Sequence, residues 1–321
     1  MIAIIGCGAW ATTVAKMCAE NGRHTKIWVH RHEYVDLFNT HFENKIALPN
    51  IKLPQIFASE DMATVLADVT AILYCVPTKF TDTLAYFLSH DIKVPVLCLS
   101  KGLIGPPDWT ICQHIESRIS GNVAVLSGPN LAMEVAHQKP CAAVVGCRDE
   151  ATAKMLATLV TRPYFRVYFS TDRLGVAWGG ILKNYLAITA GIADGLALGT
   201  NAKAALLTRG LAEMTRIATV FGGQKETLYG LSGVGDLIAT CASTESRNYQ
   251  VGFGLTQQNG VHPGTGHAVA EGLRTVQYLK IWNDRAGLDL PILTQLYEVL
   301  YASRPVKQAM TALLTREIRE E

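Results

Sequence analysis

The sequence lacks several features that would indicate particular classes of protein. Its eight cysteines include no CxxC pair, and most of them lie in apolar runs. We therefore expect buried reduced thiols in a reducing compartment, and neither a disulfide framework nor a metal site. No long block of like charge occurs and the formal net charge is only +2. Neither nucleic acid nor an anionic membrane is expected as a partner.

A targeting segment and a membrane span are also missing from the pattern. The opening MIAIIGCG has no basic leader and no cleavage site, and it predicts a strand that enters a glycine turn. The most apolar long stretch, residues 181–198, contains Lys183, Asn184 and Asp194, which predicts a buried globular helix. We expect a cytoplasmic protein without membrane insertion.

Charged residues are scarce, at 17%, whereas 49% of the chain is hydrophobic and its mean hydropathy is +0.18. This composition indicates extra surface buried between domains or subunits, so we expect a homo-oligomer, most simply a homodimer. A chain of 321 residues also exceeds the usual size of one mixed α/β domain. Two domains are therefore expected.

The hydrophobic pattern changes near Asp172. Before it, short apolar runs alternate with helix-length segments, which is typical of parallel βαβ units. The expected strands are residues 2–5, 25–29, 70–76, 94–99, 123–126, 142–145 and 165–169. After it, the expected helices are residues 174–198, 202–221, 236–241, 266–282 and 292–302. We predict a Rossmann-type doubly wound, mostly parallel sheet over 1–171 and an all-helical substrate and catalytic domain over 172–321, joined by a packed junction.

A glycine turn follows the first expected strand. Gly6, Gly8 and Ala11 form G-x-G-x-x-A, in which the glycines permit a tight turn and close approach of backbone N–H groups to a pyrophosphate. Two glycines can simply form a turn, but their position after the first strand of a βαβ unit favours a dinucleotide. Trp10 within the turn either covers the core or contacts the cofactor.

The tip of the second expected strand carries His30 and Arg31, where an NAD enzyme usually has an acid that binds the ribose 2′-hydroxyl. A cation there suits a 2′-phosphate, so NADP(H) is the preferred cofactor and NAD(H) is possible. Alternatively, Arg31 is a solvated surface residue and Glu33 takes the role of the acid.

Two further strand ends carry polar groups, and ligands of such sheets collect at the carboxyl ends of strands. Lys101 follows the fourth strand and is expected to contact an anion or substrate, although it could be an ordinary exposed charge. Gly128 and Asn130 follow the fifth strand and should present backbone N–H groups and a side-chain amide at a helix start.

In the helical half, Lys183 lies in a run that is apolar or small on nearly every face. A lysine in such a helix must pair with an anion, lose its proton or line a wet cleft, unless it reaches the surface by its flexible stem. Gly179, Gly180 and Ala187 lie around it and leave room for a ligand or for backbone. With Asn184 next to it, we interpret Lys183 as functional.

Two short polar phrases follow. Asp236 begins a short helix with Thr240 one turn beyond on the same face, so Asp236 is either an N-cap or a catalytic residue. Ser246-Arg247-Asn248 places a guanidinium between two hydrogen-bonding side chains. That combination suits a phosphate monoester.

Nine phrases along nearly the whole chain resemble one family, the NAD(P)-dependent glycerol-3-phosphate dehydrogenases. In the family's order they are GCGAWA, LPNIKLP, SKGL, SGPN, GGILKN, NAKAALLTRGLAEM, GLSGVGDLIATC, ESRN and AVAEG. The resemblance implies an oxidoreductase that interconverts dihydroxyacetone phosphate and sn-glycerol 3-phosphate with NAD(P)H. It further implies reduction as the physiological direction, feeding glycerophospholipid synthesis. No metal is required.

The resemblance also implies residue roles. Lys183 would accept the proton in the oxidation direction, with Asp236 orienting it and Asn184 or Thr240 holding substrate hydroxyls. The substrate would be surrounded by Lys101, Gly128, Asn130, Asp236, Ser246, Arg247 and Asn248. The cofactor would be contacted by Ala9, Trp10, His30, Ala132, Val269 and Glu271, with Lys101 and Arg247 also near it.

Four places depart from the family's pattern. Ala11 stands where glycine is usual, Asn130 where Ser or Thr is usual, and Trp178 where a smaller aliphatic residue is common. Tyr249-Gln250 stands where basic residues often follow SRN. Asn130 and Trp178 bear on the shape of the substrate pocket.

Two other functions stay open. Another β-hydroxyacid-type dehydrogenase would also join a dinucleotide domain to a helical domain, but it gives no reason for SRN after GVGDL. A non-catalytic NADPH-sensing protein would not need Lys183, Asp236 and Arg247 together.

Overall fold

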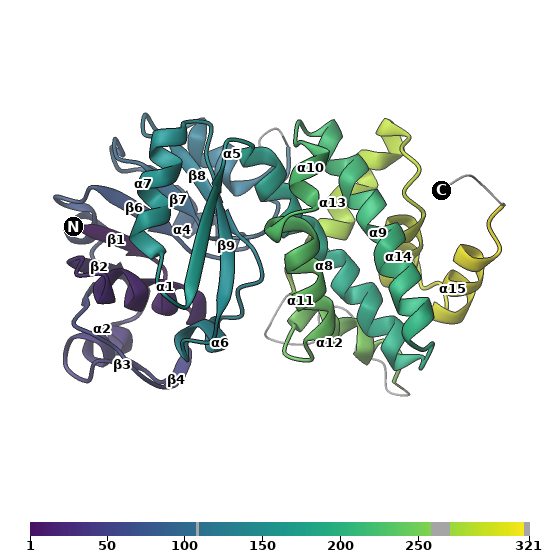
Figure 1. The fold of residues 1–321 in the computed structure, drawn as a ribbon, viewed down its shortest axis with the longest axis horizontal. Helices are drawn as coiled ribbons and strands as arrows, with labels where there is room; N and C mark the ends of the chain where they lie inside the picture. Colours follow the sequence, from purple (N-terminus) through teal and green to yellow (C-terminus); the bar gives the residue numbers. More distant parts are fainter. Residues whose placement is uncertain (107–108, 258–269, 318–321) are drawn as a thin grey trace. The chain divides into compact units, whose positions relative to one another are not determined.

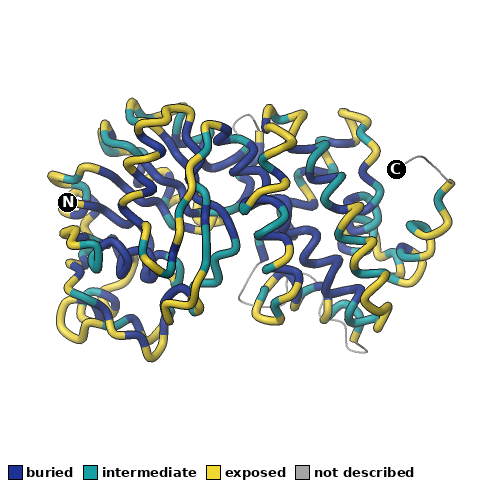
Figure 2. Tube along the Cα trace, viewed as in Figure 1, coloured by how far each residue is buried: buried dark blue, intermediate teal, exposed yellow. Residues whose placement is uncertain are grey.

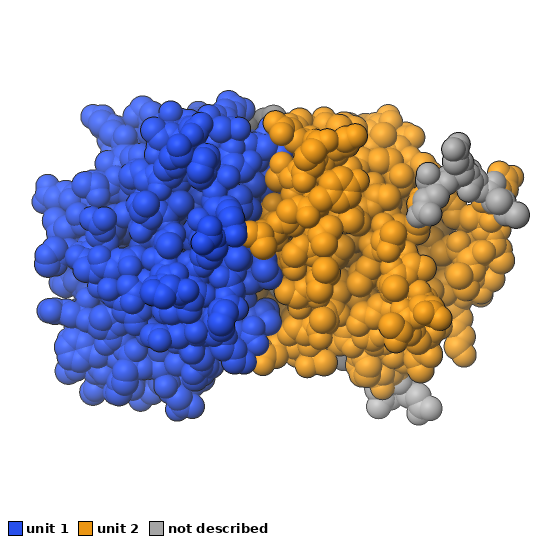
Figure 3. Space-filling model, viewed as in Figure 1, with its two compact units in different colours: residues 1–177 blue, residues 178–321 orange. Residues whose placement is uncertain are grey.

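The computed structural model describes residues 1–106, 109–257 and 270–317 of the chain (Figure 1). It divides into two compact units, Met1–Ala177 (unit 1) and Trp178–Glu321 (unit 2), which Figure 3 distinguishes by colour. The division falls inside helix α8 (Arg173–Gly195). The functional domains 1–171 and 172–321 stay a prediction.

Unit 1 is built around an eight-stranded sheet. Its order is β10-β9-β8-β7-β6-β1-β2-β5, and every pair is parallel except β8 with β9. The strands are β1 (Ile2–Ile5), β2 (Thr25–Trp28), β5 (Phe57–Ser59), β6 (Ala71–Tyr74), β7 (Val96–Cys98), β8 (Val123–Ser127), β9 (Cys141–Gly146) and β10 (Phe165–Ser170). The predicted doubly wound, mostly parallel sheet is confirmed.

Seven of the eight strands are the predicted ones, and the eighth, β5, was not predicted. This strand has only three residues, and its sequence FAS carries neither an apolar run nor an alternating pattern. The small antiparallel pair β3 (Glu43–Asn44) and β4 (Leu48–Lys52) was also missed. Both additions are held by pairing with neighbours, which a local hydrophobic pattern does not report.

Helices cover both faces of the sheet because consecutive residues of a strand point to opposite sides. Ile2 and Ile4 of β1 join one buried cluster, whereas Ala3 and Ile5 join the other. The first cluster includes residues of α1 (Ala9–Glu20), α2 (His32–Asn39), α6 (Ala132–Ala136) and α7 (Glu150–Val160). The second includes residues of α3 (Met62–Leu66), α4 (Thr81–Leu88) and α5 (Ile111–Glu116). The central strands are therefore buried along their length (Figure 2).

The strand order reverses at β1, because the chain builds outward through β2 and then crosses to β6. In open α/β sheets this switch point is where ligands bind, at the carboxyl ends of the strands. Gly6 follows β1 at that point with φ +114°, and a Cβ there would lie 2.8 Å from the carbonyl oxygen of Cys75. Only glycine fits both the backbone angle and the close strand.

Unit 2 is helical, and its described residues contain no strand. After α8 come α9 (Thr200–Val220), α10 (Lys225–Leu228), a π-helical turn (Leu231–Gly235), α11 (Asp236–Ala242), α12 (Arg247–Gly254), α13 (Glu271–Ala286), α14 (Pro291–Tyr301) and α15 (Val306–Leu314). Residues 266–269 of the expected helix 266–282 lie outside the described residues. In the described part of the chain, no helix combines the length and the apolar character needed to cross a bilayer.

Trp178 belongs to the core of unit 2. Its ring is fully buried and stacks on Phe221 at 4.2 Å between centroids, and Phe221 in turn meets Trp282 at 4.7 Å. The unusual tryptophan before the double glycine is therefore explained by aromatic packing.

Candidate active site

Lys183 lies in the middle of α8 and is paired with an acid on α11. Its Nζ donates to Asp236 Oδ1 at 2.5 Å and to Thr240 Oγ1 at 2.6 Å. Thr240 Oγ1 also donates to Asp236 Oδ1 at 3.2 Å. All three side chains are buried. A buried lysine held by one carboxylate and one hydroxyl has the arrangement that proton transfer requires.

Asp236 is the first residue of α11, and the N-cap of that helix is Gly235. The N-cap interpretation of Asp236 is therefore wrong, since the carboxylate serves Lys183 and Thr240. The turn before it packs directly on α8, because a Cβ at Gly179 would lie 2.6 Å from the carbonyl oxygen of Ser232. On this side of α8, the room that glycine leaves near Lys183 is filled by backbone.

A second polar chain runs from α8 through α12 to α13. Asn248 Nδ2 donates to Asn184 Oδ1 at 3.0 Å, and Asn248 Oδ1 accepts from the backbone N–H of Gly272 at 3.0 Å. Both asparagines are buried. Asn184 adjoins Lys183 and Asn248 adjoins Arg247. These hydrogen bonds therefore fix the Ser246-Arg247-Asn248 segment relative to Lys183. They also fix Glu271, the first residue of α13.

Helix α12 begins at the Ser246-Arg247-Asn248 phrase. Ser246 is its N-cap, and its Oγ accepts from the backbone N–H of Tyr249 at 3.3 Å. Arg247 is the first helical residue and is exposed. Its guanidinium makes no hydrogen bond or ion pair with the described parts of the chain. A free guanidinium at a helix start is well placed to accept an anion.

In unit 1 the glycine turn opens helix α1. Gly8 is its N-cap, and a Cβ at Gly8 would meet nothing within 4 Å, so the space beside it is open. Ala9 and Trp10 follow as half-buried first residues, and the Trp10 ring lies 6.2 Å from that of Phe165. Exposed N–H groups at the start of a twelve-residue helix suit a pyrophosphate.

The tip of β2 is organised by a thiol. Cys7 Sγ lies 3.3 Å from His30 Nδ1, and the His30 ring lies 5.4 Å from that of Tyr34. Burial raises the pKa of the Cys7 thiol to about 11, so it stays protonated. Burial and the nearby Arg31 charge lower the pKa of His30, which favours the neutral ring at pH 7.

Arg31 and Glu33, the two candidates for reading the ribose, lie together. Arg31 Nη1 is 3.3 Å from Glu33 Oε1, and both side chains are more than half exposed. The cation and the acid that were predicted as alternatives at this strand tip therefore form one exposed ion pair.

The ends of β7 and β8 carry a third group of polar residues. Lys101 Nζ donates to the carbonyl oxygen of Gly128 at 3.2 Å. Gly128 has φ +142°, and a Cβ there would lie 3.0 Å from the carbonyl oxygen of Ala142. Both amide atoms of Asn130 are buried without a hydrogen-bond partner in the described structure. A buried amide without partners is costly, so a bound polar ligand would stabilise it.

The remaining expected cofactor contacts are Ala132 and Val269. Ala132 is the first residue of α6, and its carbonyl accepts from Thr13 Oγ1 of α1 at 3.3 Å. Val269 lies outside the described residues. Within each unit the structure thus brings the described candidates into local groups.

Sequence reasoning missed some residues that shape these groups. Asn44 is fully buried and donates to the Cys7 carbonyl oxygen at 2.9 Å and to Thr12 Oγ1 at 2.8 Å, tying the small sheet to the glycine turn. Its sequence neighbours Glu43 and Lys45 are charged, and an asparagine between them carries no signal of burial. Asp194, Lys203 and Tyr249 form another such group, described below.

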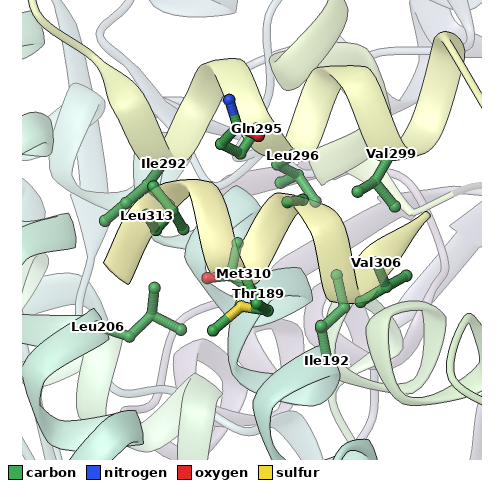
Figure 4. Close-up of a pocket in the computed structure, with 11 residues that line it drawn as sticks. Thr189, Ile192, Leu206, Ile292, Gln295, Leu296, Val299, Val306, Met310 and Leu313 are labelled. Atoms are coloured by element: carbon green, nitrogen blue, oxygen red, sulfur yellow. The ribbon is translucent and has the colours of Figure 1, made fainter. Parts of the chain in front are cut away.

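A small cavity of about 20 Å³ lies elsewhere in unit 2 (Figure 4). It is lined mainly by apolar side chains of α8, α9, α14 and α15, such as Ile192, Leu296 and Met310. Its size is that of about one water molecule. It contains none of the predicted site residues.

A doubly wound sheet with a glycine turn, followed by a helical unit with a buried lysine–aspartate pair, defines a nicotinamide-dependent dehydrogenase. The N-terminal model of the NAD-dependent glycerol-3-phosphate dehydrogenases matches residues 1–153, and the C-terminal model matches residues 172–311. The chain belongs to this family of oxidoreductases.

Individual proteins agree with this assignment. The chain is 38% identical to glycerol-3-phosphate dehydrogenase [NAD(P)+] of Solidesulfovibrio magneticus, over all of this chain and 99% of that one. The crystal structure of glycerol-3-phosphate dehydrogenase from Coxiella burnetii is similar with a TM-score of 0.89 at 35% identity, covering 98% of each chain. A ketopantoate reductase from Ralstonia eutropha shares the fold with a TM-score of 0.61 at 15% identity, covering 97% of this chain and all of that one.

Proposed function

We propose that this enzyme interconverts dihydroxyacetone phosphate and sn-glycerol 3-phosphate with NADP(H) as the preferred cofactor and NAD(H) as a possible one. The observation that carries the proposal is the buried Lys183–Asp236–Thr240 cluster, joined through Asn184 and Asn248 to the exposed Arg247. An acid–base group and a phosphate-type anchor are thereby held on adjoining parts of one unit. Membership of the family supports the same reaction.

Lys183 is the proton-transfer residue of the proposal. The nicotinamide cofactor, when bound, supplies the hydride for the C2 carbonyl carbon. The oxygen on C2 then needs a proton, which the Lys183 ammonium donates in reduction and takes back in oxidation. Asp236 orients that ammonium and offsets its charge in a buried setting, and Thr240 holds it from a second direction. The Oδ1 atom of Asn184 accepts from Asn248, and its Nδ2 group is proposed to hold a substrate hydroxyl.

The phosphate end of the substrate is assigned to Arg247, with Ser246 and Asn248 beside it. A guanidinium gives two parallel charge-assisted hydrogen bonds to a phosphate, and it is free to do so. Binding energy at this end then holds the carbonyl in place for Lys183. Lys101, Gly128 and Asn130 are proposed as further substrate contacts, and Lys101 and Arg247 also as cofactor contacts. The unpartnered amide of Asn130 supports a ligand there.

The cofactor is assigned to the residues around the glycine turn. Open space beside Gly8 and the N–H groups at the start of α1 suit its pyrophosphate. The proposed contacts are Gly6, Gly8, Ala9, Trp10, His30, Arg31, Ala132, Val269 and Glu271. Because the His30 ring is held by Cys7 and favours the neutral form, Arg31 is the cation of this tip that a 2′-phosphate would attract.

The proposal also covers the domain division, the cellular location, the oligomeric state and the direction of the reaction. Residues 1–171 form the dinucleotide-binding domain, and residues 172–321 form the substrate and catalytic domain. The enzyme is a cytoplasmic homodimer. It works in the direction of reduction and supplies glycerol 3-phosphate for glycerophospholipid synthesis.

The test is an absorbance assay at the NADPH band with purified protein and a panel of phosphorylated and unphosphorylated ketones. We expect oxidation of NADPH with dihydroxyacetone phosphate and far less with dihydroxyacetone. Preference for an unphosphorylated hydroxy acid or keto acid would establish a β-hydroxyacid-type enzyme instead. Tight binding of NADPH without turnover of any ketone would establish a sensing protein.

A further inference from the structure

Helix α12, which carries Arg247, touches α8 backbone to backbone. A Cβ at Gly252 of α12 would lie 1.8 Å from the carbonyl oxygen of Ile188, and one at Gly191 of α8 would lie 2.1 Å from the carbonyl oxygen of Tyr249. Such close contact sets the distance between the helices. The relative rotation of the helices depends on the side chains around the contact.

Two side-chain hydrogen bonds join α12 to α8, one on each side of that contact along α8. Asn184 lies before the contact residues of α8 and bonds Asn248. Asp194 lies beyond them, near the end of α8, and its Oδ2 accepts from the Tyr249 hydroxyl at 2.7 Å. Ten residues of helix separate Asn184 and Asp194 along α8, which is about 15 Å. On α12 both hydrogen bonds come from the two residues that follow Arg247, so they hold the N-terminal end of α12 against α8.

Helix α9 also contributes to the hydrogen bonding at Asp194. Lys203 of α9 donates to the same Asp194 oxygen at 2.6 Å, and its Nζ lies 5.5 Å from the Tyr249 ring centroid. Burial acts to raise the pKa of Asp194, but the bonds from Lys203 and Tyr249 outweigh it and hold that pKa below its usual value. Burial and the Asp194 carboxylate raise the pKa of Tyr249 to about 12. At neutral pH the network is therefore a carboxylate with two donors, which is its strongest form.

We propose that Tyr249, held by Asp194 and Lys203, is a positioning residue that sets the place of Arg247 relative to Lys183. The inference rests on the proposed function, because the effect is felt at the substrate phosphate. The Tyr249 hydroxyl donates to Asp194, so in this proposal Tyr249 acts through Arg247.

The first variant is Tyr249→Phe, which keeps the ring and removes the hydroxyl. We expect KM for dihydroxyacetone phosphate to rise about three- to tenfold, while kcat stays within about twofold. KM for NADPH should change less, because most of the proposed cofactor contacts lie away from α12. Residual turnover of unphosphorylated dihydroxyacetone should not change. The matched control is Tyr301→Phe, which removes a 2.8 Å hydroxyl bond to the Leu273 carbonyl oxygen in the same unit. The control should leave all kinetic constants in place.

The second variant, Lys203→Met, removes the other donor to Asp194 and should shift the same KM in the same direction. In the double variant the two shifts should not multiply, because both act through one carboxylate. Values of KM within twofold of wild type in both single variants, or equal shifts in Tyr249→Phe and Tyr301→Phe, would overturn the inference. If the wild type turns over no dihydroxyacetone phosphate, the proposed function fails. Calorimetric binding of sn-glycerol 3-phosphate to the same variants then tests the positioning, and unchanged affinity overturns it.

Discussion

The two units of this enzyme form their proposed sites in different ways. In unit 1 the backbone dominates: Gly6 and Gly128 adopt positive φ against neighbouring strands, and the start of α1 presents N–H groups. In unit 2 side chains dominate: Lys183, Asp236 and Thr240 are buried and bonded to one another. A cofactor common to many enzymes is suited by a backbone cradle, whereas proton transfer to one substrate needs a specific titratable group.

Lys183 offers the strongest test of this difference between the two units. Lys183→Ala should lower kcat by about 10² to 10⁴-fold, the usual effect of removing a positioned acid–base group, while NADPH affinity stays near that of the wild type. Steady-state kinetics and fluorescence titration with NADPH measure the two effects. Lys280→Ala is a control, because Lys280 pairs with Asp284 within α13. A Lys183→Ala enzyme that keeps most of its kcat would remove Lys183 from the mechanism.

Arg247 tests whether side chains of unit 2 also bind the substrate. Arg247→Ala should reduce kcat/KM for dihydroxyacetone phosphate by several kcal/mol of transition-state binding, roughly 10² to 10³-fold, because a charge-assisted bidentate contact is lost. Unphosphorylated dihydroxyacetone should be affected much less. Equal losses with both substrates would assign Arg247 a role other than holding phosphate.

Arg31 tests whether a side chain also contributes to cofactor binding in unit 1, where backbone groups form most of the proposed site. Arg31→Asp should lower the ratio of kcat/KM for NADPH over NADH by about 10 to 100-fold, since an exposed contact to a 2′-phosphate contributes only about 1 to 3 kcal/mol. The wild-type preference should also fall with added salt. A wild-type ratio below one, or a ratio that the substitution leaves unchanged, would show that Arg31 serves only its ion pair with Glu33.

The smallest effect concerns Glu213, a buried side chain of unit 2 outside the proposed site. Its carboxylate accepts from the backbone N–H groups of Ile292 and Leu293 at 2.6 and 3.1 Å, and it faces the Tyr185 hydroxyl. Burial raises its pKa from 4.5 to about 7, although these backbone bonds and Arg216 oppose the shift. Between those values the folded state binds more protons than the unfolded state. The free energy of unfolding should therefore fall as pH rises from about 4.5 to 7.

Glu213→Gln should remove this pH dependence. The difference in unfolding free energy between wild type and variant should change by about 1 to 3 kcal/mol between pH 5 and pH 8, measured by urea denaturation. Glu226→Gln, at an exposed position of α10, is the control and should show no such change. A parallel pH profile for wild type and Glu213→Gln would contradict the shift.

Local patterns predicted much of the fold. All seven expected strands exist. The central ones are buried and leave continuous apolar runs in the sequence, whereas β10 at the edge has only one buried residue. The long helices α8, α9 and α14 were found within a few residues, because each buries an apolar face. Strands β3, β4 and β5 and helices α10, α12 and α15 were missed. They are short, and contacts with distant segments stabilise them more than any pattern of their own.

The sequence by itself determined the class of chemistry. A lysine in an apolar helix, an arginine between two hydrogen-bonding side chains and glycines after a first strand each have a physical meaning at their own position. Partnerships were decided only by the tertiary structure. Asp236 is 53 residues from Lys183 and could have been a helix cap, Cys7 meets His30 across 23 residues, and Tyr249 meets Asp194 across 55. A hydrogen bond tolerates a change of only a few tenths of an ångström in the donor–acceptor distance, and the packing of the folded chain sets that distance.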